Sequence, residues 1–277
     1  MASLRPTTTT TKDPLFREIE IIHEATGRPY GTVLDAGTGG HSLRWLTSLD
    51  VKRIVAVSAD LGSGEGKGAS QLRSSLDASR GDVLVEGSWC TSPPALDTEF
   101  DTIVCDYLVG SMDGFTPFQQ DRIFEELVPL LKPTGVLHLV GLQPVYHQLG
   151  TAAYNNLSDE KRIVVDVARL RDACILLAGH RPYREFPVEW IQRQLDRAGL
   201  GLLQPPKTFS VLWKHQTLKT QLDVARRKLP YFPDPTLADT MRARIDALDA
   251  KAKDLLPERG VPYTYDYVVS ATPRGVS

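Results

Sequence analysis

Short apolar runs alternate with segments of helical spacing through the first half of the chain, and this rhythm constrains the fold more than any other feature. The runs expected to form buried strands are residues 32–35, 53–57, 82–86, 100–106 and 136–140. The helical segments that follow the first, second and fourth runs are 42–49, 69–78 and 117–131. Strands joined in this way lie parallel, with right-handed crossovers. The chain is therefore predicted to form an α/β fold around a mostly parallel sheet.

The second half is less regular and has longer helical stretches. One helix is expected to start at the cap Ser158-Asp159-Glu160 and to continue through Ile163 to Leu177. Further helices are expected at 187–198, 218–229 and 237–256, and two more strands at 209–213 and 263–272. Residues 146–185 and 214–257 are then helical insertions after the fifth and sixth strands, and long additions of this kind often form lids. We expect a disordered tail at 1–13 and one domain at 14–277, whose core is 14–145. Asp13-Pro14 is expected to cap and start its first helix.

The composition is typical of a soluble globular domain without a polynucleotide partner. Of the 277 residues, 42% are hydrophobic and 24% are charged, which suits one large domain. The formal net charge is −2, whereas proteins that contact many phosphates carry a basic excess. No apolar stretch approaches the ~20 residues needed to span a bilayer. We therefore expect neither a nucleic-acid partner nor a membrane partner.

The cysteines and the N-terminus bear on the cellular compartment. Cys90, Cys105 and Cys174 are too few and too widely spaced for a disulfide framework or a zinc site. This fits a reducing environment, and we expect the chain to be cytoplasmic. Residues 1–12 are rich in threonine and lack the apolar core of a secretory signal. They also lack acids, so the remnant of an organelle-targeting segment is the alternative to a disordered tail.

A cluster of glycines follows the first strand, in Asp35-Ala36-Gly37-Thr38-Gly39-Gly40. Glycines there let the backbone turn tightly and approach a ligand beyond the carboxyl ends of the strands. The dinucleotide pattern G-x-G-x-x-G is not completed. An acid two residues before Gly37 would repel a phosphate, but it could hold the cationic amino group of an amino-acid-bearing cofactor, directly or through water. A turn that Asp35 merely caps is the structural alternative.

Three motifs, in this order, resemble those of the class I S-adenosylmethionine-dependent methyltransferases. Residues 33–39 are similar to the family's hydrophobic-hydrophobic-acid-x-Gly-x-Gly motif, although His41 stands where the family often has a third glycine. Residues 100–104 are similar to its fourth strand, and residues 130–137, which include Lys132-Pro133, to its turn into the fifth. The resemblance covers about residues 32–142. It implies a Rossmann-like three-layer sandwich with a seven-stranded, mostly parallel sheet and an antiparallel last strand.

The resemblance also implies a site for S-adenosyl-L-methionine, with S-adenosyl-L-homocysteine as the product. The family usually has an acid after the second strand for the ribose hydroxyls; the candidates here are Ser58 and Asp60, of which Asp60 is favoured. After the third strand, Ser88 could bond the adenine and Trp89 could cover its ring, or Trp89 is a core residue. The residues expected at the cofactor are Asp35, Gly37, Thr38, Gly39, His41, Ser58, Asp60, Ser88, Trp89, Asp106 and Tyr107.

The catalytic demands on such a protein are modest, because the cofactor supplies the electrophile and the protein aligns the nucleophile. Asp106, after the fourth strand, is the leading carboxylate, to bind the acceptor or act as a base; a loop-capping role is the alternative. His147 and His180 are candidate bases, or surface histidines. Asp106 and Asp113 lack the further ligands of a metal pair, so no metal is expected.

Together these features predict in-line methyl transfer to an O, N or S atom of a small molecule. Residues 207–259 hold 11 basic and 7 acidic residues, a mild excess more typical of a solvated helical pair than of a nucleic-acid groove. The alternatives are a protein or RNA methyltransferase, a cofactor-binding protein without transfer activity, and a nicotinamide-dependent dehydrogenase. The apolar stripe of the 237–256 helix could pack on the sheet, cover the acceptor or form a homodimer.

Overall fold

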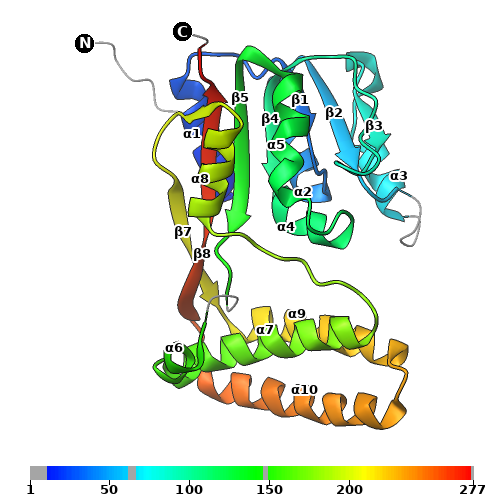
Figure 1. Cartoon of the computed structure of the whole chain (residues 1–277), viewed down its shortest axis with the longest axis vertical. Helices are drawn as coiled ribbons and strands as arrows, with labels where there is room; N and C mark the ends of the chain where they lie inside the picture. The colour runs from blue at the N-terminus through cyan, green and yellow to red at the C-terminus, as the bar shows by residue number, and fades with distance from the viewer. Residues whose placement is uncertain (1–10, 62–66, 146–148, 276–277) are drawn as a thin grey trace. The chain divides into compact units, whose positions relative to one another are not determined.

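The computed structural model describes residues 11–61, 67–145 and 149–275 (Figure 1). The internal contacts of the chain divide it into two units. Unit 1 comprises Met1–Leu142, Glu185–Phe209 and Asp266–Ser277, and unit 2 comprises Gln143–Arg184 and Ser210–Tyr265. The sequence predicts that residues 14–277 form one domain with two helical insertions, at 146–185 and 214–257. In the structure, the two insertions assemble with each other, so they have a core of their own.

An eight-stranded sheet, counted over the described residues, has the strand order β3-β2-β1-β4-β5-β8-β6, with β7 paired to β8. Its strands are β1 (Thr32–Asp35), β2 (Arg53–Ser58), β3 (Val83–Glu86), β4 (Phe100–Asp106), β5 (Leu131–Leu142), β6 (Leu200–Leu202), β7 (Lys207–Trp213) and β8 (Val261–Pro273). β1 to β5 are parallel, and β8 is antiparallel to β5. The predicted α/β fold with an antiparallel final strand is confirmed. β6 is the strand that sequence reasoning missed, because three residues are too few to show a period.

Helices cover both faces of the sheet in unit 1, which makes three layers (Figure 1). They are α1 (Pro14–Ala25), α2 (Gly40–Leu46), α3 (Lys67–Ser74), α4 (Leu108–Ser111), α5 (Ile123–Leu127) and α8 (Val188–Arg197). α1 and α2 pack on one face through Phe16 and Trp45, whose rings stack at 4.3 Å between centroids. The Trp45 indole N–H donates to the buried Glu20 carboxylate at 2.9 Å. The predicted start of α1 is confirmed, because Asp13 Oδ1 accepts from the Leu15 amide at 2.8 Å.

The long helix predicted at 117–131 is wrong in extent. The structure has a 3₁₀ turn at Gln120–Arg122, then α5, then a second 3₁₀ turn at Val128–Leu130 that leads into β5. Pro129 cannot donate to a helical ladder. Phe118, which lies within the predicted helix, has a left-handed φ of 67° and is 74% exposed. The spacing of apolar residues continues across these breaks, so the period alone does not reveal them.

Gly141 on β5 gives room to a large aromatic residue on the neighbouring strand. It pairs with Tyr267 of β8, and a Cβ at position 141 would overlap the Tyr267 hydroxyl oxygen. Tyr267 is 1% exposed, and its hydroxyl donates to the Phe186 carbonyl at 2.7 Å. The missing side chain at Gly141 is therefore what lets Tyr267 reach across the sheet and hold the segment that precedes α8.

A chain of buried polar groups joins α1 to the sheet in unit 1. His23 Nδ1 lies 3.1 Å from His138 Nε2, and His138 Nδ1 lies 2.7 Å from the Ser270 hydroxyl. Burial lowers the pKa of His23 and lowers that of His138 well below its usual value. Both rings are therefore neutral at neutral pH, because a proton added here would be removed from water without a counter-charge.

Replacing His23 with glutamine is expected to make the free energy of unfolding fall less steeply as the pH is lowered. A histidine whose pKa falls on folding stabilises the fold above its unfolded pKa of 6.5, and this contribution is lost as the pH falls below that value. Each such histidine can cost up to about 1.4 kcal/mol per pH unit. Urea unfolding between about pH 7.5 and 5 measures the slope. Parallel profiles for the wild type and the variant would contradict this account.

Unit 2 is a helical assembly whose three long helices, counted over the described residues, lie side by side (Figure 1). Its helices are α6 (Thr151–Asn155), α7 (Asp159–Leu177), α9 (His215–Lys228) and α10 (Pro235–Leu255). The apolar stripe of α10, whose partner the sequence leaves open, packs through Ile245 and Leu248 into the same core as α7 and α9. Trp213 is buried there, and its indole N–H donates to the Tyr263 carbonyl. No helix among the described residues is long and apolar enough to cross a membrane.

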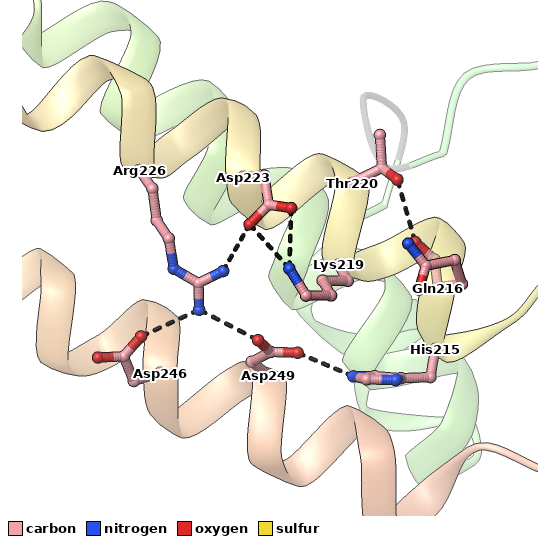
Figure 2. Close-up of polar contacts among 8 residues, drawn as sticks. All are labelled: His215, Gln216, Lys219, Thr220, Asp223, Arg226, Asp246 and Asp249. Atoms are coloured by element: carbon pink, nitrogen blue, oxygen red, sulfur yellow. Dashed lines mark hydrogen bonds and ion pairs between the residues drawn. The ribbon is translucent and has the colours of Figure 1, made fainter.

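Charged side chains join α9 to α10 beside that core (Figure 2). Arg226 donates to Asp246 at 3.0 Å, to Asp249 at 3.1 Å and to Asp223 at 2.7 Å. His215 Nε2 lies 2.8 Å from the other oxygen of Asp249. The sequence predicts a solvated helical pair with interleaved charges. In the structure these charges form a network of ion pairs, which fixes the register of α9 against α10.

Candidate functional site

The carboxyl ends of β1, β2 and β4 lie at one edge of the sheet in unit 1. Asp35 pairs with Ala56 of β2 and with Val104 of β4, while Asp106 ends β4 beside Val140. Parallel strands in register end together, so the residues that follow them converge on this edge. We call it the carboxyl-edge site and define it by Asp35, Gly39, Ser58, Asp106 and Tyr107.

Asp35 is the most deeply buried carboxylate of the site, with no exposed surface. Its Oδ2 accepts a hydrogen bond from the Ser42 hydroxyl at 2.9 Å. Among the described residues its Oδ1 has no hydrogen-bond partner. Burial raises the pKa of Asp35 to about 7, although the nearby hydroxyls of Thr38 and Ser42 act in the opposite direction. Burying the ionised carboxylate with one unpartnered oxygen costs free energy. A ligand that brings a hydrogen-bond donor to this oxygen would offset the cost.

The glycine turn after β1 is tied to both neighbouring strands. The Ala36 amide donates to the Val104 carbonyl at 2.9 Å, and the Thr38 amide donates to the Val57 carbonyl at 2.8 Å. A Cβ at Gly37 would lie 2.8 Å from a Leu108 methyl carbon, so this glycine has a packing role. At Gly39 and at Gly40, by contrast, a Cβ would meet nothing within 4 Å. The open space beside the turn therefore lies at the second and third glycines.

The hydroxyl of Thr38 is the second unsatisfied group of the turn. Its Oγ1 is buried and, among the described residues, has no hydrogen-bond partner. This hydroxyl lies near enough to Asp35 to lower the pKa of that carboxyl, yet neither Asp35 Oδ1 nor the hydroxyl has a hydrogen bond of good geometry among the described residues. Buried polar atoms without partners are rare in folded proteins, and a bound ligand is one way to satisfy them.

Asp106 and Tyr107 continue the site at the end of β4. Burial raises the pKa of Asp106 to about 6; His41 lowers it, whereas the negative charges of Asp13 and Asp266 raise it. Tyr107 has a left-handed φ of 48°, which is uncommon for an aromatic residue. Its hydroxyl donates to Asp266 at 2.9 Å, and its amide donates to the Val140 carbonyl at 3.1 Å. These contacts hold Tyr107, the residue next to Asp106, in its left-handed turn.

The two ribose candidates lie together at the end of β2. The strand ends at Ser58, as the sequence predicts within one residue. The Ser58 hydroxyl donates to the Asp60 carbonyl at 3.3 Å and accepts from the Asp60 amide at 3.4 Å. Asp60 is exposed. Both residues therefore belong to one local turn at the carboxyl edge, and the choice between them stays a prediction.

The two adenine candidates have different surroundings. Trp89 is 4% exposed, and its indole N–H donates to the Ala36 carbonyl at 2.5 Å. Trp89 is thus a buried residue that hydrogen-bonds to the glycine turn, which agrees with the alternative prediction that it belongs to the core. Ser88 is half-buried and forms a bridge with Ser92, and its hydroxyl accepts from Thr91 at 3.2 Å.

The three histidine candidates have separate settings. His41 lies over the start of α1, with Nε2 3.4 Å from Asp13 Oδ2 and its ring 4.8 Å from that of Phe16. His180 belongs to unit 2, where it is exposed and contacts Lys228 at 3.1 Å. His147 lies outside the described residues. Within residues 11–61, 67–145 and 149–275, no group of three or more His, Cys, Asp or Glu side chains could hold a metal ion.

Sequence reasoning missed two carboxylates of this edge, Asp13 and Asp266, and the hydroxyl of Ser42. The sequence indicates Asp13 only as a helix cap, whereas in the structure it also approaches His41 and raises the pKa of Asp106. Asp266 has a raised pKa because it is buried. An acid inside the apolar pattern of β8 was the available signal for Asp266. No signal marks Ser42, since serine is common in the first turn of a helix.

No family model matches the chain, and no curated protein matches it. Solved structures do match. The cyclopropane synthase MmaA2 from Mycobacterium tuberculosis is 18% identical with a TM-score of 0.52, covering 95% of this chain and 88% of that one. Mycolic acid cyclopropane synthase CmaA1, complexed with SAH and CTAB, is 17% identical with a TM-score of 0.52, covering 92% and 84%. The YcgJ protein of Bacillus subtilis is 17% identical with a TM-score of 0.52, covering 94% and 100%. This likeness confirms the fold that the sequence resemblance implies.

Proposed function

We propose that this chain binds S-adenosyl-L-methionine and transfers its methyl group to an O, N or S atom of a small molecule. The observation that carries the proposal is the buried Asp35, which keeps one oxygen without a partner among the described residues, beside the open turn at Gly39. A cationic amino group is the kind of donor that satisfies such an oxygen. The resemblance of residues 33–39 to the methyltransferase motif supports the same cofactor. So does the shared fold with CmaA1, whose structure holds SAH.

The residues of the carboxyl-edge site fit this cofactor by their chemistry. Asp35 and Thr38 would hold its amino-acid end, because both present buried polar atoms without partners among the described residues. Ser58 or Asp60 would hold its ribose hydroxyls at the end of β2. When bound, the cofactor supplies an electrophilic methyl group on a sulfonium.

Asp106 is the residue that would face the acceptor. With a pKa of about 6, its carboxyl group is mostly ionised at neutral pH, yet it can take up a proton at little cost. An ionised Asp106 oxygen would orient an acceptor that arrives protonated and remove its proton. The hydrogen bond of 2.9 Å between the Tyr107 hydroxyl and Asp266 would hold the residue next to Asp106 in place.

The other partners of the reaction stay proposals. His147 and His180 are kept as candidate bases, and a homodimer through the second insertion is kept as the assembly. A small acceptor is favoured over RNA because unit 1, which holds the carboxyl-edge site, has an acidic balance: 16 Lys and Arg against 23 Asp and Glu. An acidic surface repels a polynucleotide.

Calorimetric titration with S-adenosyl-L-homocysteine and, separately, with NAD tests the proposal. We expect S-adenosyl-L-homocysteine to bind with a Kd in roughly the micromolar range, about −8 kcal/mol, and NAD to show no heat of binding. Incubating the protein with methyl-labelled cofactor and a cell extract, then separating small molecules from protein and RNA, shows where the label goes. Failure to bind S-adenosyl-L-homocysteine would refute the proposal, and binding without label in any fraction would leave a cofactor-binding protein.

A further inference from the structure

Large apolar side chains are exposed at one end of unit 2. Leu176 and Leu177, in the last turn of α7, are 59% and 41% exposed, and Tyr231, in the turn after α9, is 62% exposed. The His180 ring packs against the Tyr231 ring at 5.2 Å between centroids, in an edge-on arrangement. His180 Nδ1 also lies 3.1 Å from Lys228 Nζ. These contacts bring the end of α7 and the end of α9 together into one surface.

The same two segments carry basic residues and no acids. Neither residues 173–184 nor residues 224–233 contain Asp or Glu, whereas together they contain four Arg and one Lys. Arg181 and Arg227 are exposed, and Lys228 is half-buried. We call this the α7–η5 surface and define it by Leu176, Leu177, His180, Arg181, Arg227 and Tyr231, where η5 is the 3₁₀ turn Leu229–Tyr231.

Four acids flank these segments, namely Asp172, Glu185, Asp223 and Asp234. Three of them have contacts within unit 2. Asp172 is buried and pairs with Arg171 at 2.6 Å. Asp223 pairs with Lys219 at 3.0 Å and with Arg226, which belongs to the α9–α10 network. Asp234 caps α10 by accepting from the Thr236 amide at 2.8 Å. Unit 2 as a whole holds 16 Lys and Arg against 11 Asp and Glu, a formal charge of +5.

We propose that the α7–η5 surface docks unit 2 on an anionic membrane, whereas the sequence composition alone predicts no membrane partner. Leucine and tyrosine side chains gain free energy when they enter the boundary between headgroups and acyl chains. Arginine and lysine beside them are attracted to anionic headgroups, at about a fivefold gain in partitioning for each basic residue. The +5 charge of unit 2 complements such a surface.

A polynucleotide fits this surface less well than a lipid bilayer does. Contacts to phosphates need basic groups and gain nothing from exposed leucines. A patch that combines exposed leucines, a tyrosine and arginines, with no acid in its two segments, has the composition of an interfacial membrane contact. The absence of a spanning helix among the described residues is compatible with this, because docking leaves the chain on one side of the bilayer.

Vesicle sedimentation of the full chain tests the proposal. The comparison is between vesicles of phosphatidylcholine and vesicles in which about one lipid in three is phosphatidylglycerol. We expect binding to the anionic vesicles only, weakened by added salt. The double variant Leu176→Ser/Tyr231→Ser should lower the partition coefficient by more than about tenfold. The double variant Arg181→Glu/Arg227→Glu should lower it by at least about tenfold.

Matched controls separate the surface from general effects. Lys251→Glu/Lys253→Glu makes the same change in charge on exposed positions of α10, where acids adjoin, and is expected to keep most of the binding. Ile21→Ser removes a side chain that is 41% exposed on α1, in unit 1, and should leave binding unchanged. Thermal unfolding checks that every variant folds. If the Leu176→Ser/Tyr231→Ser variant does not fold, the single substitution Tyr231→Ser replaces it.

Three outcomes would overturn the proposal. One is equal binding to neutral and anionic vesicles, or no binding to either. A second is a loss of binding in the charge variant while the Leu176→Ser/Tyr231→Ser variant binds like the wild type, which would point to a soluble polyanion. The third is a wild-type dimer in sedimentation analysis that the Leu176→Ser/Tyr231→Ser variant turns into a monomer without changing vesicle binding, which would assign the surface to a second copy of the chain.

Discussion

Asp35→Asn is expected to weaken binding of S-adenosyl-L-homocysteine by roughly 10- to 100-fold and, at the same time, to make the ligand-free protein more stable at pH 8. The loss arises because an amide cannot supply the negative charge that holds a cationic amino group. The gain arises because Asp35 is buried with one oxygen unpartnered among the described residues, so its ionisation opposes folding. The asparagine side chain keeps the volume and an oxygen for the Ser42 hydroxyl.

The pH dependence of this gain has a definite sign. Folding raises the pKa of Asp35 from 3.8 to about 7, so the folded protein binds more protons than the unfolded chain between these values. The wild type therefore loses stability as the pH rises through this window, up to about 4 kcal/mol. The amide of the variant does not titrate, so the variant should match or fall below the wild type near pH 4 and exceed it at pH 8.

Urea unfolding at both pH values and calorimetry with S-adenosyl-L-homocysteine measure the two effects. Asp101→Asn is the matched control, because Asp101 pairs with Lys132 at 2.7 Å and with the Thr32 amide at 2.9 Å, and its pKa is lowered. That variant should be less stable than the wild type at pH 8 and should bind the ligand normally. Unchanged affinity in Asp35→Asn would remove Asp35 from the site, and lower stability at pH 8 would contradict the electrostatic account.

Gly141→Ala is expected to lower the free energy of unfolding by about 3 kcal/mol or more, an effect at the upper end of overpacking substitutions. The added Cβ would overlap the Tyr267 hydroxyl and the ring carbon that carries it, and Tyr267 is held from the other side by its bond to Phe186. Neither strand can move away without breaking the β5–β8 ladder. Urea unfolding at one pH measures the loss.

Gly201→Ala is the control for this substitution. Gly201 lies on β6 of the same sheet, and a Cβ there would lie 3.4 Å from a carbon of the flexible Arg274 side chain. This variant should be neutral or slightly stabilised, because alanine loses less backbone entropy than glycine does. The double variant Gly141→Ala/Tyr267→Leu should be less destabilised than the sum of its single changes. Equal effects of the two alanine substitutions would mean that Tyr267 is not packed against Gly141.

Local patterns predict the strands and helices of unit 1 well where each element buries one continuous face. β4 and the start of α1 occur at the residues that the sequence indicates. The 117–131 helix fails because apolar spacing carries no information on the left-handed turn at Phe118, which depends on contacts with distant parts of the chain. The separate core of unit 2 likewise depends on contacts of α7 with α9 and α10. In the sequence, α8, β6 and β7 separate α7 from these two helices.

The site is predictable to the extent that it follows strand ends. Asp35, Ser58 and Asp106 are found at one edge because a parallel sheet brings its carboxyl ends together. The sequence does not reveal that Gly37 serves packing while Gly39 leaves open space, since both are glycines of one motif. Nor does it place Asp266 beside Tyr107, because that contact joins strands far apart in the chain.

The place of β8 in the sheet has a consequence for the way the chain is made on the ribosome. β5 is complete in sequence once Leu142 has been synthesised, but Val140 pairs with Val268, which is translated 128 residues later. At the usual pace of translation this interval lasts roughly 6 to 26 s. Throughout it, β5 has an open hydrogen-bonding edge of the kind that recruits other strands. The nascent chain is therefore open to aggregation along β5 until β8 has been made, and a chaperone that covers this edge would protect it.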